Sequence, residues 1–397
     1  MARIVISHSW SLNMGDAAML MTTVGMLRAM APGASIGALV SHPDFTRQRC
    51  PDLGVSLEEW PWPIPGEKKP GILGLASYPL IFLSNLLSAA AFRLFGARVF
   101  ILNSRFRAPL SMLFDSDVVI HPGGDFISPN YFFITTFGEI LMAKILGKRT
   151  VILAQSMGPF EGLLNRALAA PFLRMADLII VRERKTALEL ERMGVARAHL
   201  TADLAFAFPG KIECAARGER VVICPKNIPR NRERYALGIK RLAKRIKEEF
   251  GFGIVLLPTD LHDVDFQSEL GSSLAPDAAI VRAVHPPGEI ARIIASSQFV
   301  VSSRMHAIIL GCLSSTPFCA IGDSFKFEEI LGPLSGGCTI GIDALNEDGV
   351  ERIIGLIKER DAHGSAIARN LPRVREKSAE SARILERHFR EWGLIEG

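Results

Sequence analysis

Residues 298–311 read QFVVSSRMHAIILG. The run from Gln298 to Val301 is short, apolar and rich in valine, which is typical of a buried strand. Small and apolar residues from Ala307 onward predict a helix. Arg304 and His306 therefore fall where a strand passes into a helix, and ligands bind at that edge of an open α/β sheet.

Arg304 and His306 suit chemistry on a small anion. Arginine offers a fixed pair of donors for phosphate or carboxylate, and histidine can move a proton near neutral pH. Each residue also has an ordinary structural explanation: Arg304 could pair with a carboxylate elsewhere, and His306 could be a satisfied core residue. Whether other strands end in similar residues decides between the two.

Composition limits the class of protein. The chain has 397 residues, enough for two α/β domains, and 48% of them are apolar and 22% charged. These values fit a packed globular enzyme. The net charge of +5 is spread along the chain. It favours anionic small substrates or a membrane surface as partners, and we expect no nucleic acid.

The cysteines and the first residues indicate a compartment. Six cysteines are scattered with no CxxC spacing, which predicts reduced thiols and neither a zinc site nor a disulfide framework. Residues 1–7 have the pattern of a first strand and not of a signal peptide. We therefore expect a cytoplasmic protein. No Walker loop, HExxH or EF-hand pattern occurs, so we expect no metal and no cofactor.

Four predicted strands in the first half of the chain end in small or polar residues. One such loop alone would be an ordinary turn, and Asn13 or Asp16 could simply cap the following helix. Together the loops predict the rim of one cleft, because the carboxyl ends of parallel strands share one sheet edge. The candidates at these strand ends are Asn13, Gly15 and Asp16, then Gly123 and Gly124, then Ser156 and Gly158, and last Arg182.

Residues 71–92 form the most apolar run and have the length of a membrane span. Pro79, Asn85 and several serines argue against a span. Lysines before the run and arginines after it suit a helix lying on an anionic bilayer. Three interpretations stay open: a buried or partly covered helical hairpin, a helix at the inner membrane surface, and a true span.

The pattern predicts an α/β protein with two Rossmann-like, doubly wound domains facing a cleft. We expect residues 1–200 to form the N-terminal domain and residues 201–218 a linker. Residues 219–345 would form the C-terminal domain. The charged helical tail, residues 346–397, is expected to pack back across the junction.

Five motifs, in this order and spacing, resemble the polysaccharide pyruvyl transferase family. The resemblance covers residues 4 to about 331 and implies the two-Rossmann architecture of glycosyltransferases. Asp125 stands where the family usually has a third small residue, and the insertion at 71–92 lies outside the core pattern. The motifs are Asn13-Met14-Gly15-Asp16, Gly123-Gly124, Ser156-Met157-Gly158-Pro159, Arg182-Glu183 and Arg304-Met305-His306-Ala307.

The resemblance implies transfer of a pyruvyl group from phosphoenolpyruvate to two hydroxyls of a sugar, which forms a cyclic ketal and releases phosphate. The acceptor would be a cell-surface polysaccharide or its lipid-linked precursor. The donor is small and highly anionic, so it needs arginines, and its enol carbon needs an acid while a base assists the hydroxyl.

Roles for individual residues follow from this chemistry. Arg304 and the backbone around Met305 would hold the donor, with Arg182 and Lys326 adding positive charge. His306 would move a proton and Asp16 would be the base. His121 and His285 are held in reserve as acid or base.

Other functions remain open. A glycosyltransferase using a nucleotide sugar should have a ribose-binding glutamate late in the second domain, and Glu328 or Glu329 could serve. A non-catalytic relative that binds a sugar or anion is a second alternative. A membrane-surface scaffold, resting only on residues 71–92, is a third.

Overall fold

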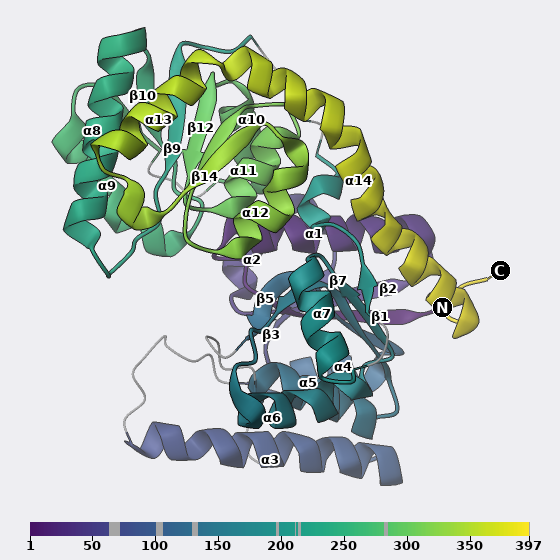
Figure 1. Ribbon diagram of the computed structural model, residues 1–397. Coiled ribbons are helices and arrows are strands. Elements are labelled where there is room, and N and C mark those ends of the chain that lie inside the picture. Colours follow the sequence, from purple (N-terminus) through teal and green to yellow (C-terminus); the bar gives the residue numbers. More distant parts are fainter. Residues whose placement is uncertain are drawn as a thin grey trace.

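Two parallel sheets, each with its own helices, form two domains (Figure 1). They are seen in a computed structural model that describes residues 1–62, 72–100, 106–128, 134–195, 198–210, 212, 216–281 and 285–396.

The N-terminal sheet runs in the order β3-β2-β1-β4-β6-β7-β8, with β5 pairing with β6 off this path, and every pairing is parallel. The order reverses between β1 and β4, the point at which doubly wound sheets bind ligands. The strands are β1 (Arg3–Ser9), β2 (Ser35–Val40), β3 (Ser56–Glu59), β4 (Val118–His121), β5 (Gly124–Ile127), β6 (Arg149–Met157), β7 (Leu178–Val181) and β8 (His199–Leu200).

Alternation along β1 gives this sheet two buried faces. Ile4 and Ile6 pack with α1 on one face, and Val5 packs with α4 and α5 on the other, as a side-chain period of two requires. The helices of this domain are α1 (Met14–Met30), α2 (Pro43–Arg49), α3 (Ile72–Phe95), α4 (Arg107–Asp115), α5 (Ile134–Ile145), α6 (Gly162–Met175) and α7 (Arg184–Arg192).

The C-terminal sheet runs in the order β11-β10-β9-β12-β13-β14 and repeats the reversal seen in the first. Its strands are β9 (Arg220–Cys224), β10 (Gly253–Leu256), β11 (Ala278–Ile280), β12 (Phe299–Ser302), β13 (Phe318–Ile321) and β14 (Gly337–Ile340). The helices α8 (Arg232–Phe250), α9 (Val264–Leu274) and α13 (Glu347–Lys358) cover one face. On the other face lie α10 (Pro287–Ala295), α11 (Met305–Cys312) and α12 (Phe325–Leu331). The expected fold class, two doubly wound domains, is confirmed.

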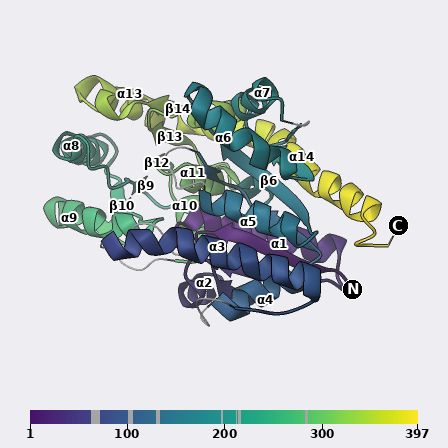
Figure 2. The same ribbon diagram turned by 90° about the horizontal axis from the view of Figure 1, so that it is seen from below.

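The last helix, α14 (Arg360–Glu391), leaves the C-terminal domain and runs down the side of the molecule to the N-terminal domain (Figures 1 and 2). Its Leu385 and Phe389 join the core around β1. Nearer the junction, the Ser378 hydroxyl donates to the Asp203 carbonyl at 2.8 Å. The tail therefore ties the two domains together.

The junction itself is an apolar core. A short helical turn, Leu204–Ala207, lies between β8 and β9. Its Phe206 packs with Met14 and Ala18 of α1 and with Ile308 of α11. This contact sets the start of α1 against the start of α11, which are the two helix ends that carry the candidate residues.

Two local expectations change. The residues after β4 do not form a simple turn, because Gly124–Ile127 adds strand β5 beside β6. The apolar run is a single helix, α3, not a helical hairpin, and residue 71 lies outside the described residues. Among the residues that the structure describes, no helix is both long and apolar enough to cross a membrane.

Candidate functional site

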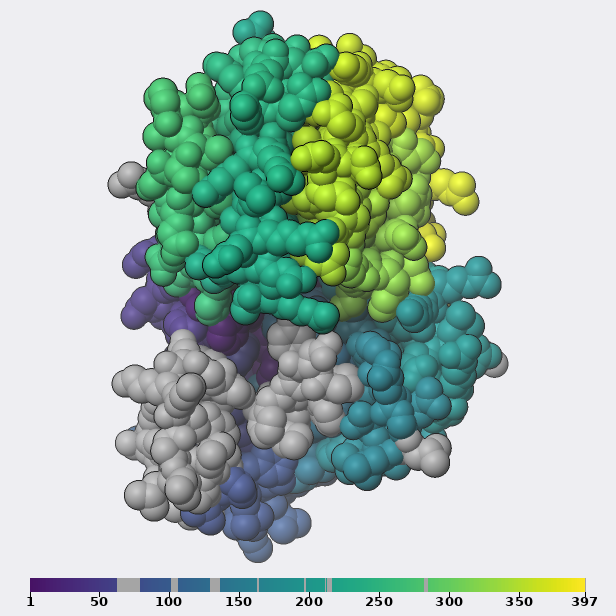
Figure 3. Space-filling model, turned by 60° about the vertical axis from the view of Figure 1, so that its left-hand side comes forward, coloured from purple at the N-terminus to yellow at the C-terminus, as the bar shows by residue number. Residues whose placement is uncertain are grey.

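A cavity of about 850 Å³ lies between the domains, where the carboxyl ends of both sheets meet. Figure 3 shows the C-terminal domain stacked on the N-terminal domain. Both domains contribute to the cavity wall. The N-terminal domain supplies His8, Trp10, Asn13, Asp16, Trp60, Gly124, Asp125, Phe126, Gly158 and Arg182, and the C-terminal domain supplies Lys226, Asp260, Arg304, Met305, His306 and Lys326.

Asn13 has both of the roles considered for it. Its side-chain oxygen accepts from the Gly15 amide at 2.7 Å, which caps α1. Its Nδ2 donates to Asp260 of the C-terminal domain at 3.2 Å. One residue on, the Met14 amide donates to the Thr259 carbonyl at 2.8 Å. The start of α1 is therefore bonded directly to the facing domain.

His306 lies against this helix start. Gly15 leaves the space for its ring, because a methyl group at Gly15 would overlap Nδ1 and Cγ of His306. The Nε2 atom lies 3.5 Å from the Asp203 carboxylate. The structure thus packs His306 of the C-terminal domain against Gly15, the residue next to Asp16 in the N-terminal domain.

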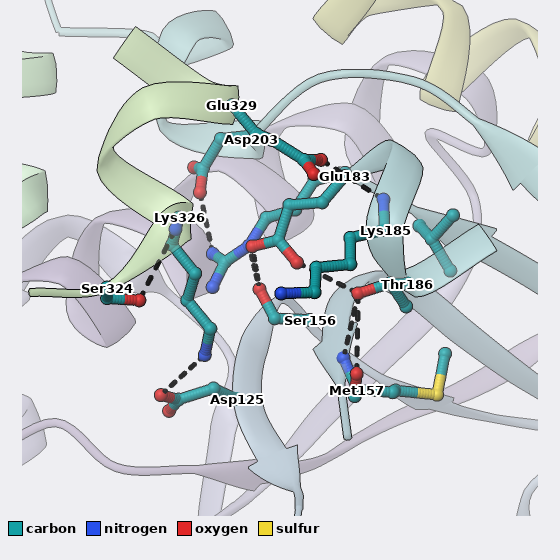
Figure 4. Close-up of polar contacts among 12 residues, drawn as sticks. Asp125, Ser156, Met157, Glu183, Lys185, Thr186, Asp203, Ser324, Lys326 and Glu329 are labelled. Carbon is teal, nitrogen blue, oxygen red and sulfur yellow. Dashed lines mark hydrogen bonds and ion pairs between the residues drawn. The ribbon is translucent and has the colours of Figure 1, made fainter. Parts of the chain in front are cut away.

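Asp203 and Arg182 form a buried ion pair behind His306. Nη1 of Arg182 donates to Asp203 at 2.6 Å, and Nε donates to the Ser156 hydroxyl at 2.7 Å. Ser156 in turn bonds Glu183 (Figure 4). Burial acts to raise the pKa of Asp203, but Arg182 and His306 outweigh it and hold that pKa well below its usual range. Arg182, which Ser156 holds in place, thus keeps the Asp203 carboxylate charged beside His306.

Arg304 is held in a fixed orientation by two carboxylates. Nε and Nη2 donate to Asp263 at 2.8 and 2.9 Å, and Nη1 lies 3.1 Å from Asp260. Its amide donates to the Ser302 hydroxyl at 2.9 Å, which shapes the turn into α11. The ion-pair explanation considered from the sequence is therefore present, and the guanidinium still borders the cavity.

Lys326 crosses from α12 to the N-terminal domain. Its Nζ lies 3.1 Å from the carboxylate of Asp125 on β5, a contact drawn in Figure 4. Burial acts to raise the pKa of Asp125, and Lys326 and then Arg182 lower it by more. On the same helix, Glu329 accepts from the Lys185 amide at 3.1 Å. That glutamate is thus bonded to α7 and not extended toward the cavity.

Asp16 differs from the other carboxylates. Burial, and after it the charges of Asp125 and Asp260, raise the pKa of Asp16 well above its usual value, although Arg182 and Arg304 oppose the rise. A carboxyl group with a raised pKa holds its proton nearer to neutral pH. Asp16 is therefore suited to give a proton before it can accept one.

Lys226 is a cavity residue that sequence reasoning missed. It follows β9 after one proline, so the strand-end rule applied to the first domain would have found it. Its side chain is exposed at the cavity wall. Within the described part of the chain, no carboxylate lies within ion-pair distance of its ammonium group. Lys226 is thus available to an anion.

An aromatic wall was also missed. It consists of His8, Trp10, Trp60 and Phe126 and lines the N-terminal side of the cavity. His8 stacks on Trp60 with ring centroids 4.5 Å apart, and Trp10 lies 5.8 Å from Trp60. His8 has a φ of 67°, a left-handed conformation that is rare for histidine. Trp60 and Phe126 are far in sequence from His8 and Trp10, so no local motif joins the four.

The remaining candidates lie outside the cavity wall. Gly123 faces Met19, since a Cβ there would come within 2.6 Å of its sulfur. His121 is buried, and burial and then His8 lower its pKa to about 4 against the opposing effect of Glu139. His285 pairs with Glu289 at 2.9 Å at the start of α10. Neither histidine lines the cavity.

Solved structures share this fold. MnaA of S. aureus, solved with UDP, is 13% identical with a TM-score of 0.66, and the match covers 100% of this chain and 98% of that one. UDP-GlcNAc 2-epimerase of Neisseria meningitidis, bound to UDP-GlcNAc, is 13% identical with a TM-score of 0.60 and covers 97% and 98%. MurG of Acinetobacter baumannii is 10% identical with a TM-score of 0.54 and covers 98% and 100%.

The sequence comparison is more specific than the fold. No curated protein matches the chain. A model of the polysaccharide pyruvyl transferase family matches residues 13–324, which include Asn13, Asp16, Arg182, Arg304 and His306. This match spans most of the chain, and the chain belongs to the polysaccharide pyruvyl transferase family.

Proposed function

We propose that this protein transfers a pyruvyl group from phosphoenolpyruvate to two hydroxyls of a sugar, in a cell-surface polysaccharide or its lipid-linked precursor. The observation that carries the proposal is the meeting of His306 and Asp16 in one cavity, each supplied by a different domain. Membership of the family supports the same reaction class.

The donor would lie on the C-terminal side of the cavity. Arg304, Met305 and His306 begin α11, where amide groups and the helix dipole favour an anion. Lys226 lines the same cavity as these three residues and adds a positive charge. Arg182 would act through Asp203 and His306, since its own side chain is only 2% exposed. Lys326 would reach the donor only by leaving Asp125.

In this reaction the enzyme must donate one proton, to C3 of phosphoenolpyruvate, and accept two, one from each sugar hydroxyl. Asp16 would protonate C3 of phosphoenolpyruvate while the first sugar hydroxyl attacks C2 and gives its proton to His306. The bond between C2 and the phosphate oxygen then breaks, and phosphate leaves. The second hydroxyl attacks C2 to close the ketal and gives its proton to the Asp16 carboxylate. The raised pKa of Asp16 supports this order of acid before base.

The acceptor would lie against the aromatic wall. The cavity of about 850 Å³ is several times larger than phosphoenolpyruvate requires, so it has space for a sugar. Sugar rings present C–H faces that pack on aromatic faces, and Trp10 and Trp60 offer such faces. Asp16 lines the same cavity, so an acceptor hydroxyl there would be near the proposed acid and base.

The experiment that tests this function is phosphate release from phosphoenolpyruvate with free and lipid-linked galactose, mannose, glucose and N-acetylmannosamine acceptors. Acceptor-dependent release, with a product heavier by a pyruvyl ketal, would establish the reaction. The alternative is a nucleotide-sugar glycosyltransferase, since structural neighbours were solved with UDP or UDP-GlcNAc. Calorimetry distinguishes the two functions. A protein that binds a UDP-sugar but does not bind phosphoenolpyruvate would overturn the proposal.

Lys226→Ala is expected to weaken phosphoenolpyruvate binding by about tenfold or more, because a hydrogen bond to a charged group contributes about 1.5–3 kcal/mol. Calorimetry of the donor alone measures this. Lys226 is a better probe than Arg304, whose loss would leave buried Asp263 without its partner. Lys244→Ala on α8 is the matched control, and equal affinities of both variants would contradict the assignment.

Trp10→Ala is expected to raise the KM for the sugar acceptor by about tenfold while the donor affinity stays unchanged, because an aromatic contact surface is lost. Trp10→Phe keeps a ring and should restore most of the acceptor affinity. Steady-state kinetics with each substrate varied in turn gives both values. A change in donor affinity alone would place the acceptor elsewhere.

A further inference from the structure

The outer face of α3 is lined by leucines. Leu80, Leu83 and Leu87 are 59%, 54% and 50% exposed, and Leu94 is 73% exposed. Spacings of three, four and seven residues place these side chains on one stripe of the helix. Contact between such a stripe and water is unfavourable, and exposed apolar patches of this kind mark sites that bind an apolar partner.

The inner face of the same helix carries both apolar and polar residues, and Phe82, Ala89 and Phe92 pack there on the core. Ser84, Asn85 and Ser88 are buried. The Asn85 amide donates to the Pro61 carbonyl at 2.6 Å, and Ser88 bonds back to the Ser84 carbonyl at 2.9 Å. The helix thus already has an apolar side toward the core, and the outward leucines form a second, exposed apolar side.

The charges around this face are positive. Helices α3, α5 and α6 pack side by side as one layer under the N-terminal sheet (Figures 1 and 2). Their sequences contain four cationic residues, Arg93, Lys144, Arg166 and Arg174, and one acidic residue, Glu139. Glu139 is buried. Lys144 and Arg166 pair with Asp177 and Glu189, whereas Arg93 and Arg174 are exposed. These two exposed arginines complement an anionic surface. In the same layer, α6 exposes Leu164 and Leu168.

A short segment connects α3 to the aromatic wall of the cavity. Trp60 lines the cavity, and Trp62 packs on Phe82 of α3 with ring centroids 5.2 Å apart. The carbonyl of Pro61, between the two tryptophans, accepts from Asn85. A surface bound to α3 would therefore lie beside the cavity end proposed for the acceptor.

We infer that the leucine stripe of α3 binds the surface of an anionic phospholipid bilayer, with the helix lying flat on the membrane. Exposed leucines enter the acyl boundary, and the exposed Arg93 and Arg174 meet the lipid headgroups. The link to a lipid-linked acceptor rests on the proposed function, whereas the membrane contact does not. That contact accounts for the outward leucines of α3.

Vesicle flotation of the whole chain tests this contact. The probes are vesicles of phosphatidylcholine alone and of phosphatidylcholine with phosphatidylglycerol. The wild-type protein is expected to float with the anionic vesicles and to be released by high salt. The combined change Leu80→Gln, Leu83→Gln and Leu87→Gln should weaken binding by about a hundredfold, and Leu87→Gln alone by about fivefold.

Leu237→Gln on α8 is the matched control, because Leu237 is 48% exposed and lies in the other domain. It should float like the wild type. Wild-type protein that does not float, or a triple variant that floats as well as the wild type, would overturn the inference. So would a wild-type dimer that the triple change makes monomeric without any vesicle binding. Donor affinity, measured by calorimetry, should be the same in all variants, which separates this test from that of the reaction.

Discussion

Gly15→Ala is expected to lower turnover by about 100- to 10,000-fold, the range that positioned acid–base catalysis contributes. The added methyl group would overlap the His306 ring and would lie 2.8 Å from the His306 Cβ. Rotation of the ring cannot relieve a clash with Cβ. The start of α11 must therefore move away from α1, and His306 with it.

Gly25→Ala is the matched control in the same helix. The nearest atom to a methyl group there is Pro209 Cγ at 3.8 Å, so the change fits without movement. Alanine inside a helix should stabilise it by about 0.5–1 kcal/mol. Phosphate release and thermal unfolding, measured for both variants, separate lost positioning from lost folding.

A double variant shows whether the effect of Gly15→Ala passes through His306. If it does, adding His306→Gln should cost little more, because two changes in one unit are not additive. Turnover near the wild-type level in Gly15→Ala would contradict the placement of His306. If the losses of turnover in the two single variants multiply in the double variant, Gly15 acts independently of His306.

The fold was predictable because its signals are local. Each parallel strand is a short apolar run that ends in small or polar residues, and the alternation of strands with helices leaves few topologies. The same rule placed Asn13 and Asp16 at the edge of one sheet and Arg304 and His306 at the facing edge of the other. Strand β5 was not predicted, because Gly124–Ile127 is only four residues long, begins with glycine and aspartate, and pairs with β6 through a shifted register.

The electrostatics of the site were not predictable in the same way. The sequence places Arg182 at a strand end, but its partner Asp203 lies in the predicted linker, just after the unpredicted strand β8, whose pairing with β7 brings the two residues together. Asp16 was assigned as a base from its position. Its pKa is raised first by burial and then by the charges of Asp125 and Asp260, which come from different domains. Long-range charge of this kind has no sequence pattern.

The linker carboxylate should also stabilise the fold. Asp203→Asn is expected to lower the free energy of unfolding at neutral pH by about 3–5 kcal/mol, because it leaves the buried Arg182 charge without its nearest carboxylate. The side chains of Arg182 and Asp203 are 2% and 0% exposed. Asparagine keeps the oxygen that accepts from the Ala205 amide at 2.9 Å, so the local turn should survive.

Acid should reduce the difference between the wild type and Asp203→Asn. Because the pKa of Asp203 is lowered in the folded protein, its contribution is fully present above the unfolded pKa of about 4, declines below that value and is lost as the pH falls through the lower folded pKa. Urea unfolding at neutral pH and near pH 3 measures the gap, which should shrink on acidification. A gap of constant size would mean that the charge of Asp203 does not hold Arg182.

The exposed pair Arg47–Asp44 provides the control for this measurement. Its Nη1 and Oδ1 atoms are 2.6 Å apart, the separation found for Arg182 and Asp203, but the Asp44 side chain is 93% exposed. Water already solvates that carboxylate, so Asp44→Asn should change stability little at any pH. Equal losses in the free energy of unfolding from Asp44→Asn and Asp203→Asn would show that burial does not increase the contribution of the ion pair to stability. A larger loss from Asp203→Asn, together with slower phosphate release, would show that one buried carboxylate serves both the fold and His306.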